Sequence, residues 1–449
     1  MGRSRSRSRR PSRPRRSAIR STPEPSRAGE GPTVPDPTDS TDASSPATSS
    51  RQPWRLYALV AAAGLIVAAL AVARFLQTRD PGATTTGVPG VSNSTGACEE
   101  EQTYAACLEQ ANAGSAQAQL RLALAYDGGE GVPEDDAAAA EWYRRAAEQG
   151  VALAQFQLGT LYDAGKGVSR DAAEAARWYR RAAEQGLPLA QHNLALMYQQ
   201  GGGGVARDAA EAAHWYRSAA DQGLALAQQH LGLMYLEGSG GLARDATAAV
   251  RWFTMAAEQG LVAAQYNLGV AYETGEGVVE DHAEAARWYR QAAESGLAIA
   301  QYNLGVMHTT GDGVPRDAAE AFRWYQLAAQ QGHADAQNDL AFMYDTGEGV
   351  VEDDAEAVRW YRRAAAGGNP SAQYNLGLMY ANGDGVGQDP ARAYLWLSVA
   401  AATSAGTTDR TALESVAGDL SAAARAAADR LVATCRETAF TDCGEPAEP

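Results

Sequence analysis

Lysine and cysteine are scarce in this sequence of 449 residues, which contains a single lysine, Lys166, and four cysteines. Glycine-rich segments recur along the chain, but none continues into the Gly-Lys-Ser or Gly-Lys-Thr of a phosphate-binding loop. No serine, cysteine or pair of carboxylates recurs in an arrangement that would supply a nucleophile or a general acid and base. The sequence therefore predicts a protein that is not an enzyme and that holds no cofactor and no metal.

Long hydrophobic runs are also missing, with one exception at residues 56–73. These 18 residues carry no charge, and as a helix they would span about 27 Å, close to the hydrocarbon thickness of a bilayer. Trp54 lies where an interfacial aromatic residue is expected. We predict a single transmembrane helix over 54–76. The alternative is a cleaved signal peptide, since Ala71-Val72-Ala73 has the form of a cleavage site, but the preceding segment is far too long for one.

Charge is unevenly distributed along the chain. The formal net charge is −16, yet residues 1–55 hold 12 arginines and 5 acidic residues, a net +7, so the remainder carries −23. The arginine excess before the apolar run predicts a single-pass protein of the inner membrane, with a cytoplasmic N-terminus and a periplasmic or extracytoplasmic remainder. Clustered arginines can neutralise phosphates, but no aromatic residue is interleaved to stack on bases, and we expect no nucleic acid partner.

Two segments lack the apolar residues that a folded core needs. Residues 1–53 are rich in arginine, serine and proline, which predicts a disordered cytoplasmic tail. Residues 77–97 are rich in threonine, glycine, proline and serine, which predicts a flexible linker.

The four cysteines flank the middle of the chain, with Cys98 and Cys107 before it and Cys435 and Cys443 after it. One disulfide at each end would fit an oxidising exterior. On one continuous helix, Cys98 and Cys107 would be about 13 Å apart, beyond disulfide reach, so a turn must intervene or this pair is not bonded. Four free thiols are the alternative.

Tryptophan recurs with a spacing of 36 or 37 residues, a period typical of helix-pair solenoids, at positions 142, 178, 215, 252, 288, 324, 360 and 396. An Ala-Gln pair precedes each tryptophan, and its glutamine lies 23 or 24 residues before the tryptophan. A large apolar residue follows this alanine at +4, and tyrosine or histidine at +8, so these positions share one helical face. Glycine or alanine at +5 would let a second helix approach closely. The pattern predicts the first helix of each repeat.

The segment around each tryptophan predicts a second helix. Aspartate lies seven residues before every tryptophan, in the position of an N-cap, and pairs such as Asp171 and Glu174 form a capping-box pattern. Glycine lies eight residues after seven of the eight tryptophans, where a left-handed residue ends a helix. We expect an all-α, right-handed α/α solenoid of eight helix pairs over 115–402. A capping segment at 98–114 would precede it, and a capping helix and tail at 403–449 would follow.

The repeated segments resemble a known family. Residues 264–278, Ala-Gln-Tyr-Asn-Leu-Gly-Val-Ala-Tyr-Glu-Thr-Gly-Glu-Gly-Val, and residues 281–294, Asp-x-Ala-Glu-Ala-Ala-Arg-Trp-Tyr-Arg-x-Ala-Ala-Glu, closely resemble the Sel1-like repeat, a relative of the tetratricopeptide repeat. The resemblance covers 115–402 and implies a membrane-anchored scaffold or adaptor of a bacterial envelope. A cysteine-rich branch of the family implies the alternative, an enzyme that binds or hydrolyses cell wall or β-lactams. A lectin-like polysaccharide binder is a third possibility.

Partner-binding positions are expected two and three residues after the repeated alanine, on the first helices, which usually line the concave side of a solenoid. The aromatic and asparagine residues there are Phe156, Asn193, Tyr266, Asn267, Tyr302, Asn303, Tyr374 and Asn375. Asparagine donates and accepts hydrogen bonds at once, so it can pair with the main chain of an extended peptide. The alternative is that these residues hold neighbouring repeats together.

The acidic array favours a basic protein as the partner. His192 and His230 occupy neighbouring positions on adjacent first helices and could approach each other. Two imidazoles without a third ligand make a poor metal site.

Overall fold

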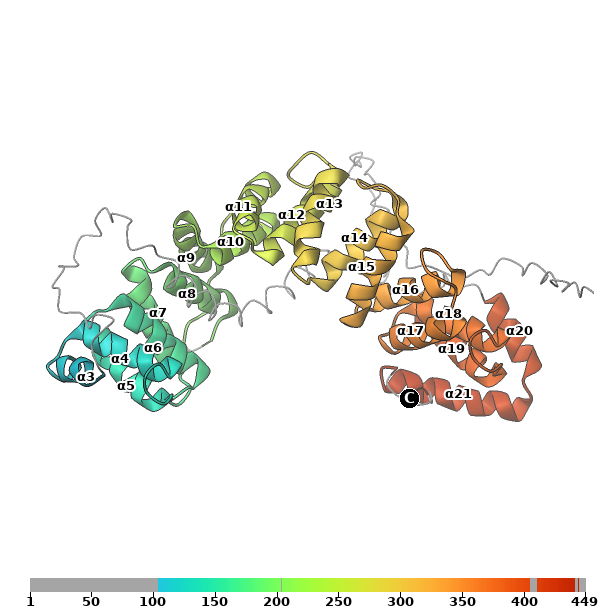
Figure 1. Ribbon diagram of the computed structural model, residues 1–449, viewed down its shortest axis with the longest axis horizontal. Helices are drawn as coiled ribbons and strands as arrows, with labels where there is room; N and C mark the ends of the chain where they lie inside the picture. Colours follow the sequence, from blue (N-terminus) through green and yellow to red (C-terminus); the bar gives the residue numbers. More distant parts are fainter. Residues whose placement is uncertain (1–103, 203, 404–409, 441–442, 444–449) are drawn as a thin grey trace, which may run out of the picture. The chain divides into compact units, whose positions relative to one another are not determined.

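The computed structural model describes residues 104–202, 204–403, 410–440 and 443, and these residues form 19 helices and no β-strand (Figure 1). They fall into two compact units, which we call the N-terminal unit (residues 104–281) and the C-terminal unit (residues 282–443). No helix in this part of the chain is long and apolar enough to cross a bilayer. The predicted tail (1–53), membrane helix (54–76) and linker (77–97) lie outside the described residues.

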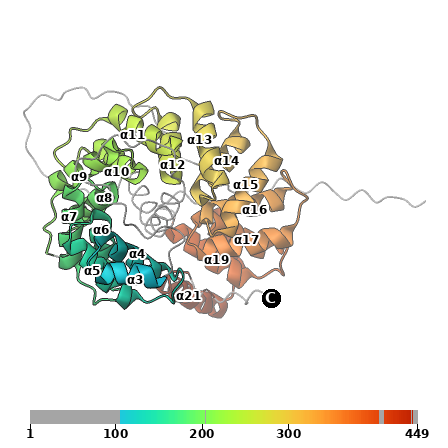
Figure 2. The same cartoon turned by 60° about the vertical axis from the view of Figure 1, so that its left-hand side comes forward.

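The helices of the N-terminal unit are α3 (Tyr104–Asn112), α4 (Ala116–Gly128), α5 (Asp136–Glu148), α6 (Ala152–Ala164), α7 (Ala172–Glu184), α8 (Pro188–Gln200), α9 (Ala209–Asp221), α10 (Ala225–Glu237), α11 (Ala246–Glu258) and α12 (Val262–Thr274). The helix that carries the Ala-Gln pair is the first helix of each repeat, and the helix that carries the tryptophan is the second. In Figure 2, first helices α6, α8 and α10 form one layer of this unit, and second helices α7, α9 and α11 form the other.

The C-terminal unit continues the same alternation through α13 (His282–Glu294), α14 (Ala298–Thr310), α15 (Ala318–Gln330), α16 (Ala334–Thr346), α17 (Asp354–Ala366), α18 (Pro370–Asn382) and α19 (Pro390–Thr403). Two helices, α20 (Thr411–Asp419) and α21 (Ala422–Glu437), then follow where the sequence predicted one capping helix. The chain becomes extended at Leu420, and the Ser421 hydroxyl caps α21 by accepting a hydrogen bond from the Ala424 N–H at 3.2 Å.

The second helices begin at the aspartates that the sequence identified. One carboxylate oxygen of Asp171 accepts hydrogen bonds from the N–H groups of Ala173 and Glu174 at 3.0 and 3.1 Å. The reciprocal bond of a capping box is not made, because the Asp171 N–H donates to the Tyr162 carbonyl at 2.9 Å. Glu174 pairs instead with Arg177, one turn further along the helix. The N-cap prediction is confirmed, and the glutamate has a different role from the one that the pattern suggested.

Two glycines of the second repeat are required by close contacts. A Cβ atom on Gly159 of α6 would lie 2.8 Å from the ring of Tyr179 on α7, which confirms that glycine at +5 lets the paired helices approach. In the loop that follows, Gly167 has a φ of +69°, and a Cβ atom there would lie 2.1 Å from the Asp136 carbonyl oxygen of the preceding repeat. The second glycine of the Gly-x-Gly loop therefore lets adjacent repeats pack together.

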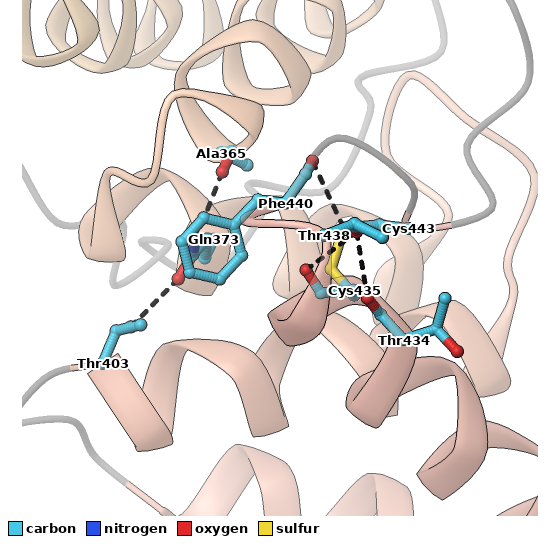
Figure 3. Close-up of a disulfide and its surroundings, with 8 residues drawn as sticks. All are labelled: Ala365, Gln373, Thr403, Thr434, Cys435, Thr438, Phe440 and Cys443. Atoms are coloured by element: carbon cyan, nitrogen blue, oxygen red, sulfur yellow. Dashed lines mark hydrogen bonds between the residues drawn. A yellow bond between two sulfur atoms is a disulfide. The ribbon is translucent and has the colours of Figure 1, made fainter.

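The C-terminal end of the chain is closed by a disulfide between Cys435 and Cys443, whose Cα atoms are 4.5 Å apart (Figure 3). Both cysteines are buried in the core that α20 and α21 share with the last repeat. Cys107 of α3 is buried and disulfide-bonded as well, whereas Cys98 lies outside the described residues. None of the three described cysteines is a free thiol.

Candidate functional site

A buried glutamine holds each first helix to its neighbours. The Nε2 of Gln155 on α6 donates to the Ala147 carbonyl of α5 at 3.0 Å, and its Oε1 accepts from the Nε2 of Gln185 at the end of α7 at 2.7 Å. Gln155 is 4% exposed. One side chain therefore joins three helices, and we call this arrangement the glutamine clamp. Complete clamps of the same form are made by Gln119, Gln191, Gln228 and Gln301.

The sequence interpretation noted the Ala-Gln pair but missed this role. The signal was present, because a glutamine recurs on a face that is otherwise apolar, and a second glutamine recurs one residue before the glycine that ends the second helix. In the last repeat, Thr403 takes the place of that second glutamine. Its hydroxyl donates to the Oε1 of Gln373 at 3.0 Å, while the Gln373 Nε2 donates to the Ala365 carbonyl at 3.2 Å (Figure 3).

Another contact between repeats joins an arginine of a second helix to a tyrosine of the next first helix. This tyrosine lies eight residues after the repeated alanine. Arg144 of α5 donates to the Tyr162 hydroxyl at 2.9 Å, and Arg180 of α7 donates to the Tyr198 hydroxyl at 2.8 Å. In the C-terminal unit, Arg362 of α17 donates to the Tyr380 hydroxyl at 2.8 Å. Together with the glutamine clamps, these bonds fix the first helices within each unit.

The eight predicted partner-binding residues lie on first helices α6, α8, α12, α14 and α18. Five of them are buried: Phe156, Tyr266, Asn267, Tyr374 and Asn375. Asn193, Tyr302 and Asn303 are half-buried. The alternative interpretation, in which these residues hold neighbouring repeats together, requires such burial. Partner binding through these residues stays a prediction.

In the C-terminal unit, polar residues at these two positions bond to one another across three first helices. Asn375 of α18 donates to the Asn338 Oδ1 of α16 at 3.3 Å, and the Asn338 Nδ2 donates to the Asp339 carboxylate at 3.0 Å. The Tyr302 hydroxyl of α14 donates to the same carboxylate. Burial and the charge of Asp339 raise the pKa of Tyr302. This network is closed, because each of these side chains has a protein partner.

In the N-terminal unit, histidines occupy the corresponding positions. The rings of His192 on α8 and His230 on α10 have centroids 5.2 Å apart, which confirms that they approach each other, and Tyr216 of α9 stacks on His230 at 4.9 Å. Burial lowers the pKa of His192 to about 3, with a smaller contribution from His230, so His192 is neutral at physiological pH. No group of three potential ligands that could hold a metal ion occurs in the described part of the chain.

Both units contain more acidic than basic residues. Residues 104–281 contain 22 acidic and 12 basic side chains, and residues 282–443 contain 21 and 12. The only lysine, Lys166, bridges its loop to the preceding repeat through Asp136 at 2.9 Å, Glu134 at 3.2 Å and Asp127 at 3.4 Å. These carboxylates raise the pKa of Lys166, the Asp136 hydrogen bond contributing most.

Comparisons with known proteins agree with this architecture. The family model described as Sel1 repeat matches the chain eight times, at residues 116–151, 152–187, 188–224, 225–261, 262–297, 298–333, 334–369 and 370–402. A Sel1 repeat protein from Oxalobacter formigenes is 36% identical, with a TM-score of 0.52 over 70% of this chain and 88% of that chain. The protective antigen c5321 of uropathogenic Escherichia coli, which displays an SLR fold, is 30% identical, with a TM-score of 0.49 over 78% of this chain and 98% of that chain. No curated protein matches the chain.

Proposed function

The chain belongs to the Sel1 repeat family, and we propose that it is a protein-interaction scaffold of a bacterial cell envelope, anchored in the inner membrane by residues 56–73. Proteins built from these repeats generally mediate protein–protein interaction. The observation that carries the proposal is the first-helix layer, which the glutamine clamps fix against two second helices at a time. A surface that is fixed before binding loses little conformational entropy when a partner docks on it.

The partner that fits this surface best is a basic protein. Both units carry an excess of acidic side chains, and most of the charged groups are exposed, so long-range attraction would speed the approach of a positively charged partner. Attraction between exposed charges is screened by salt. Capture of the partner should therefore weaken as the salt concentration rises.

An extracytoplasmic position for the repeats is supported by two observations. Arginines are concentrated before residue 56, as expected for a segment that stays in the cytoplasm. The Cys435–Cys443 disulfide and the bonded state of Cys107 suit an oxidising compartment. The alternative function, an enzyme acting on cell wall or β-lactams, rests on a family branch with a cysteine pair in every repeat, and this sequence has no cysteine between 108 and 434.

Affinity capture and a topology reporter test the proposal. The tagged full chain, solubilised from its own membranes in mild detergent, should retain a specific basic protein that a tagged control ending at residue 103 does not retain. Alkaline phosphatase fused after residue 100 should be active and membrane-bound. Retention of no protein beyond the control would contradict the scaffold, an inactive reporter would reverse the orientation, and activity in the soluble fraction would indicate cleavage after Ala73.

A further inference from the structure

The side of the first helices that faces away from their core is apolar in the N-terminal unit. Two positions of each first helix lie roughly opposite the buried leucine at +4: the position directly before the repeated alanine and the position at +6, on one helical face. On α6, α8, α10 and α12, six residues at these positions are leucine or valine, and all six are half-buried, so part of each side chain meets solvent. We call them the apolar rows. The first row consists of Leu153, Leu189 and Leu226, and the second row consists of Leu196, Leu233 and Val270.

Charge is distributed differently over the two layers of this unit. First helices α6, α8, α10 and α12 contain three acidic residues and no arginine or lysine, whereas second helices α5, α7, α9 and α11 contain seven arginines (Figure 2). Folded proteins rarely expose contiguous apolar surface unless that surface is a site of interaction. The apolar face without cations is therefore the part of this unit that best suits a partner.

Carboxylates line the edge of the layer that adjoins the first row. Each lies at the C-terminal end of a second helix, five residues before the position of the first row, and all are exposed; we call them the acidic row, which consists of Glu148, Glu184, Asp221 and Glu258. None of the four is a partner in an ion pair of the described residues. Nearby arginines make other contacts, since Arg180 donates to the Tyr198 hydroxyl. Arg181 stacks over Trp178 at 4.7 Å. This edge therefore attracts a cationic segment.

We propose that the apolar rows and the acidic row together bind a basic amphipathic α-helix of the partner protein. This inference rests on the proposed scaffold function and specifies both the binding site and the shape of the segment that occupies it. The apolar rows contact the apolar stripe of that helix, and the acidic row pairs with the lysines or arginines beside the stripe. The same carboxylates repel an anionic lipid surface, so a protein helix fits this face better than a membrane does.

The spacing of the rows selects a helix with a heptad pattern. The two rows are separated by seven residues along each first helix, which is about 10 Å and equals the width of an α-helix. Neighbouring first helices in a packed layer are also about 10 Å apart, and seven residues of an α-helix advance the same distance. A partner helix that crosses the layer therefore presents an apolar residue to the first row at every seventh position, and another to the second row three or four residues later. About 20 residues span α6 to α12.

An extended segment does not match the same spacing. It advances about 3.3 Å per residue, so every third residue meets the next first helix. Alternate side chains of an extended chain point to opposite faces, so the third residue points away from the layer when the first points towards it. Only a helix brings side chains of one face to successive first helices.

Fluorescence anisotropy of a labelled peptide tests this site, with the full chain held in phosphatidylcholine nanodiscs and empty nanodiscs measured alongside. The peptide is acetyl-(Leu-Gln-Ala-Leu-Lys-Gln-Lys)3-amide, which as a helix places its leucines on one face and its lysines beside them. The wild-type chain should bind the peptide, and empty nanodiscs should not.

Two variants of α10 test the apolar rows. Leu226→Gln and Leu233→Gln each remove one apolar contact, and each should weaken peptide binding about tenfold. Met255→Gln is the matched control, because it makes the same kind of change at a side chain that is 45% exposed on second helix α11. Its affinity should equal that of the wild type. All three variants should keep their helical content by circular dichroism, since none of these side chains is fully buried.

A double variant tests the acidic row without touching the core. Glu184→Gln combined with Asp221→Asn should weaken peptide binding about fivefold at low salt and make it less sensitive to added salt. Both side chains are exposed, so the melting temperature should stay that of the wild type. Glu141→Gln is the matched control, because Glu141 is also exposed but pairs with Arg144 and Arg145 on α5, and it should leave peptide affinity unchanged.

A second peptide of identical composition separates a helix from an extended segment. In acetyl-(Leu-Gln-Leu-Ala-Lys-Gln-Lys)3-amide, the two leucines of each heptad are two residues apart, on opposite sides of a helix but on the same side of an extended chain. The wild-type chain should bind this peptide at least about tenfold more weakly than the first.

Three results would overturn the inference: no binding of the first peptide, equal or tighter binding of the second, or unchanged affinity in both α10 variants. Self-association of the wild-type chain that Leu226→Gln abolishes would likewise assign the rows to a second copy of the chain. If the first peptide fails to bind while the full chain still captures a basic protein, the scaffold function stands and only this site is refuted.

Discussion

The glutamine clamp makes a sharp prediction about what holds neighbouring helices together. Gln119 and Gln117 lie on the same helix, α4, two residues apart. Gln119 is buried, donating to the Ala111 carbonyl at 3.0 Å and accepting from Gln149 at 2.7 Å, whereas Gln117 is exposed. Methionine resembles glutamine in shape and helix propensity, so Gln119→Met removes both hydrogen bonds with little change in packing.

The expected cost follows from those two bonds. Each lost bond is worth about 1 kcal/mol, and the Ala111 carbonyl keeps the hydrogen bond from the Gly114 N–H at 3.1 Å, so Gln119→Met should lower the free energy of unfolding by about 2 kcal/mol. Gln117→Met should change it by less than about 0.5 kcal/mol. Because each repeat contacts only its neighbours, the loss should be local to α3, α4 and α5.

Hydrogen exchange followed by mass spectrometry resolves this locality, and urea unfolding followed by circular dichroism gives the magnitude. Faster exchange confined to α3–α5 in Gln119→Met, with no change in Gln117→Met, is the expected result. Equal effects of the two variants would refute the clamp as a stabilising contact. Uniformly faster exchange throughout the N-terminal unit would refute the nearest-neighbour reasoning.

Three further predictions concern a loop, a titration and the disulfide. Gly313 has a φ of +69°, and a Cβ atom there would lie 2.1 Å from the His282 carbonyl oxygen. Gly313→Ala should therefore lower the free energy of unfolding, measured in urea, by at least about 2 kcal/mol. An unchanged free energy of unfolding would contradict the packing of that loop. Burial depresses the pKa of His192 from 6.5 to about 3, so between these pH values the folded state binds fewer protons than the unfolded state. The melting temperature should therefore fall as the pH drops from about 6.5 towards 3. The fall should be less steep in His192→Phe. A pH profile identical in the two proteins would exclude His192 as a contributor. Replacing both Cys435 and Cys443 by serine should cost about 2–3 kcal/mol and speed hydrogen exchange in α20 and α21, while unchanged exchange there would mean that the disulfide does not hold the C-terminal helices.

The repeat architecture could be predicted from the sequence because its signals are local. The tryptophan period, the N-cap aspartates and the helix-ending glycines each act within one helix or one turn, and Asp171 and Gly159 do in the structure what their positions predicted. Repetition made the prediction stronger, since eight copies of one pattern leave little ambiguity about where helices begin and end.

The contacts at the second and third positions after the repeated alanine could not be predicted in the same way, because they depend on which side chains meet across neighbouring repeats. Asn375 and Asn267 occupy equivalent positions in their repeats, yet Asn375 bonds to Asn338 whereas the Asn267 Nδ2 has no partner. Whether the asparagine is paired depends on a residue about one repeat earlier in the sequence, at a position whose residue type differs between repeats. The break between α20 and α21, by contrast, has local signals that the sequence interpretation did not use, because Gly418 lies in the last turn of α20 and Ser421 caps α21.

The most direct test of the scaffold function is site-specific photo-crosslinking in living cells. A benzophenone amino acid would be placed at position 193, half-buried in the first-helix layer on α8, or at position 255, which is 45% exposed on second helix α11 of the same unit. We predict that illumination joins a basic envelope protein to the chain from position 193 and not from position 255. Crosslinks from position 255 alone, or from neither position, would contradict the claim that the first-helix layer of this chain holds its partner.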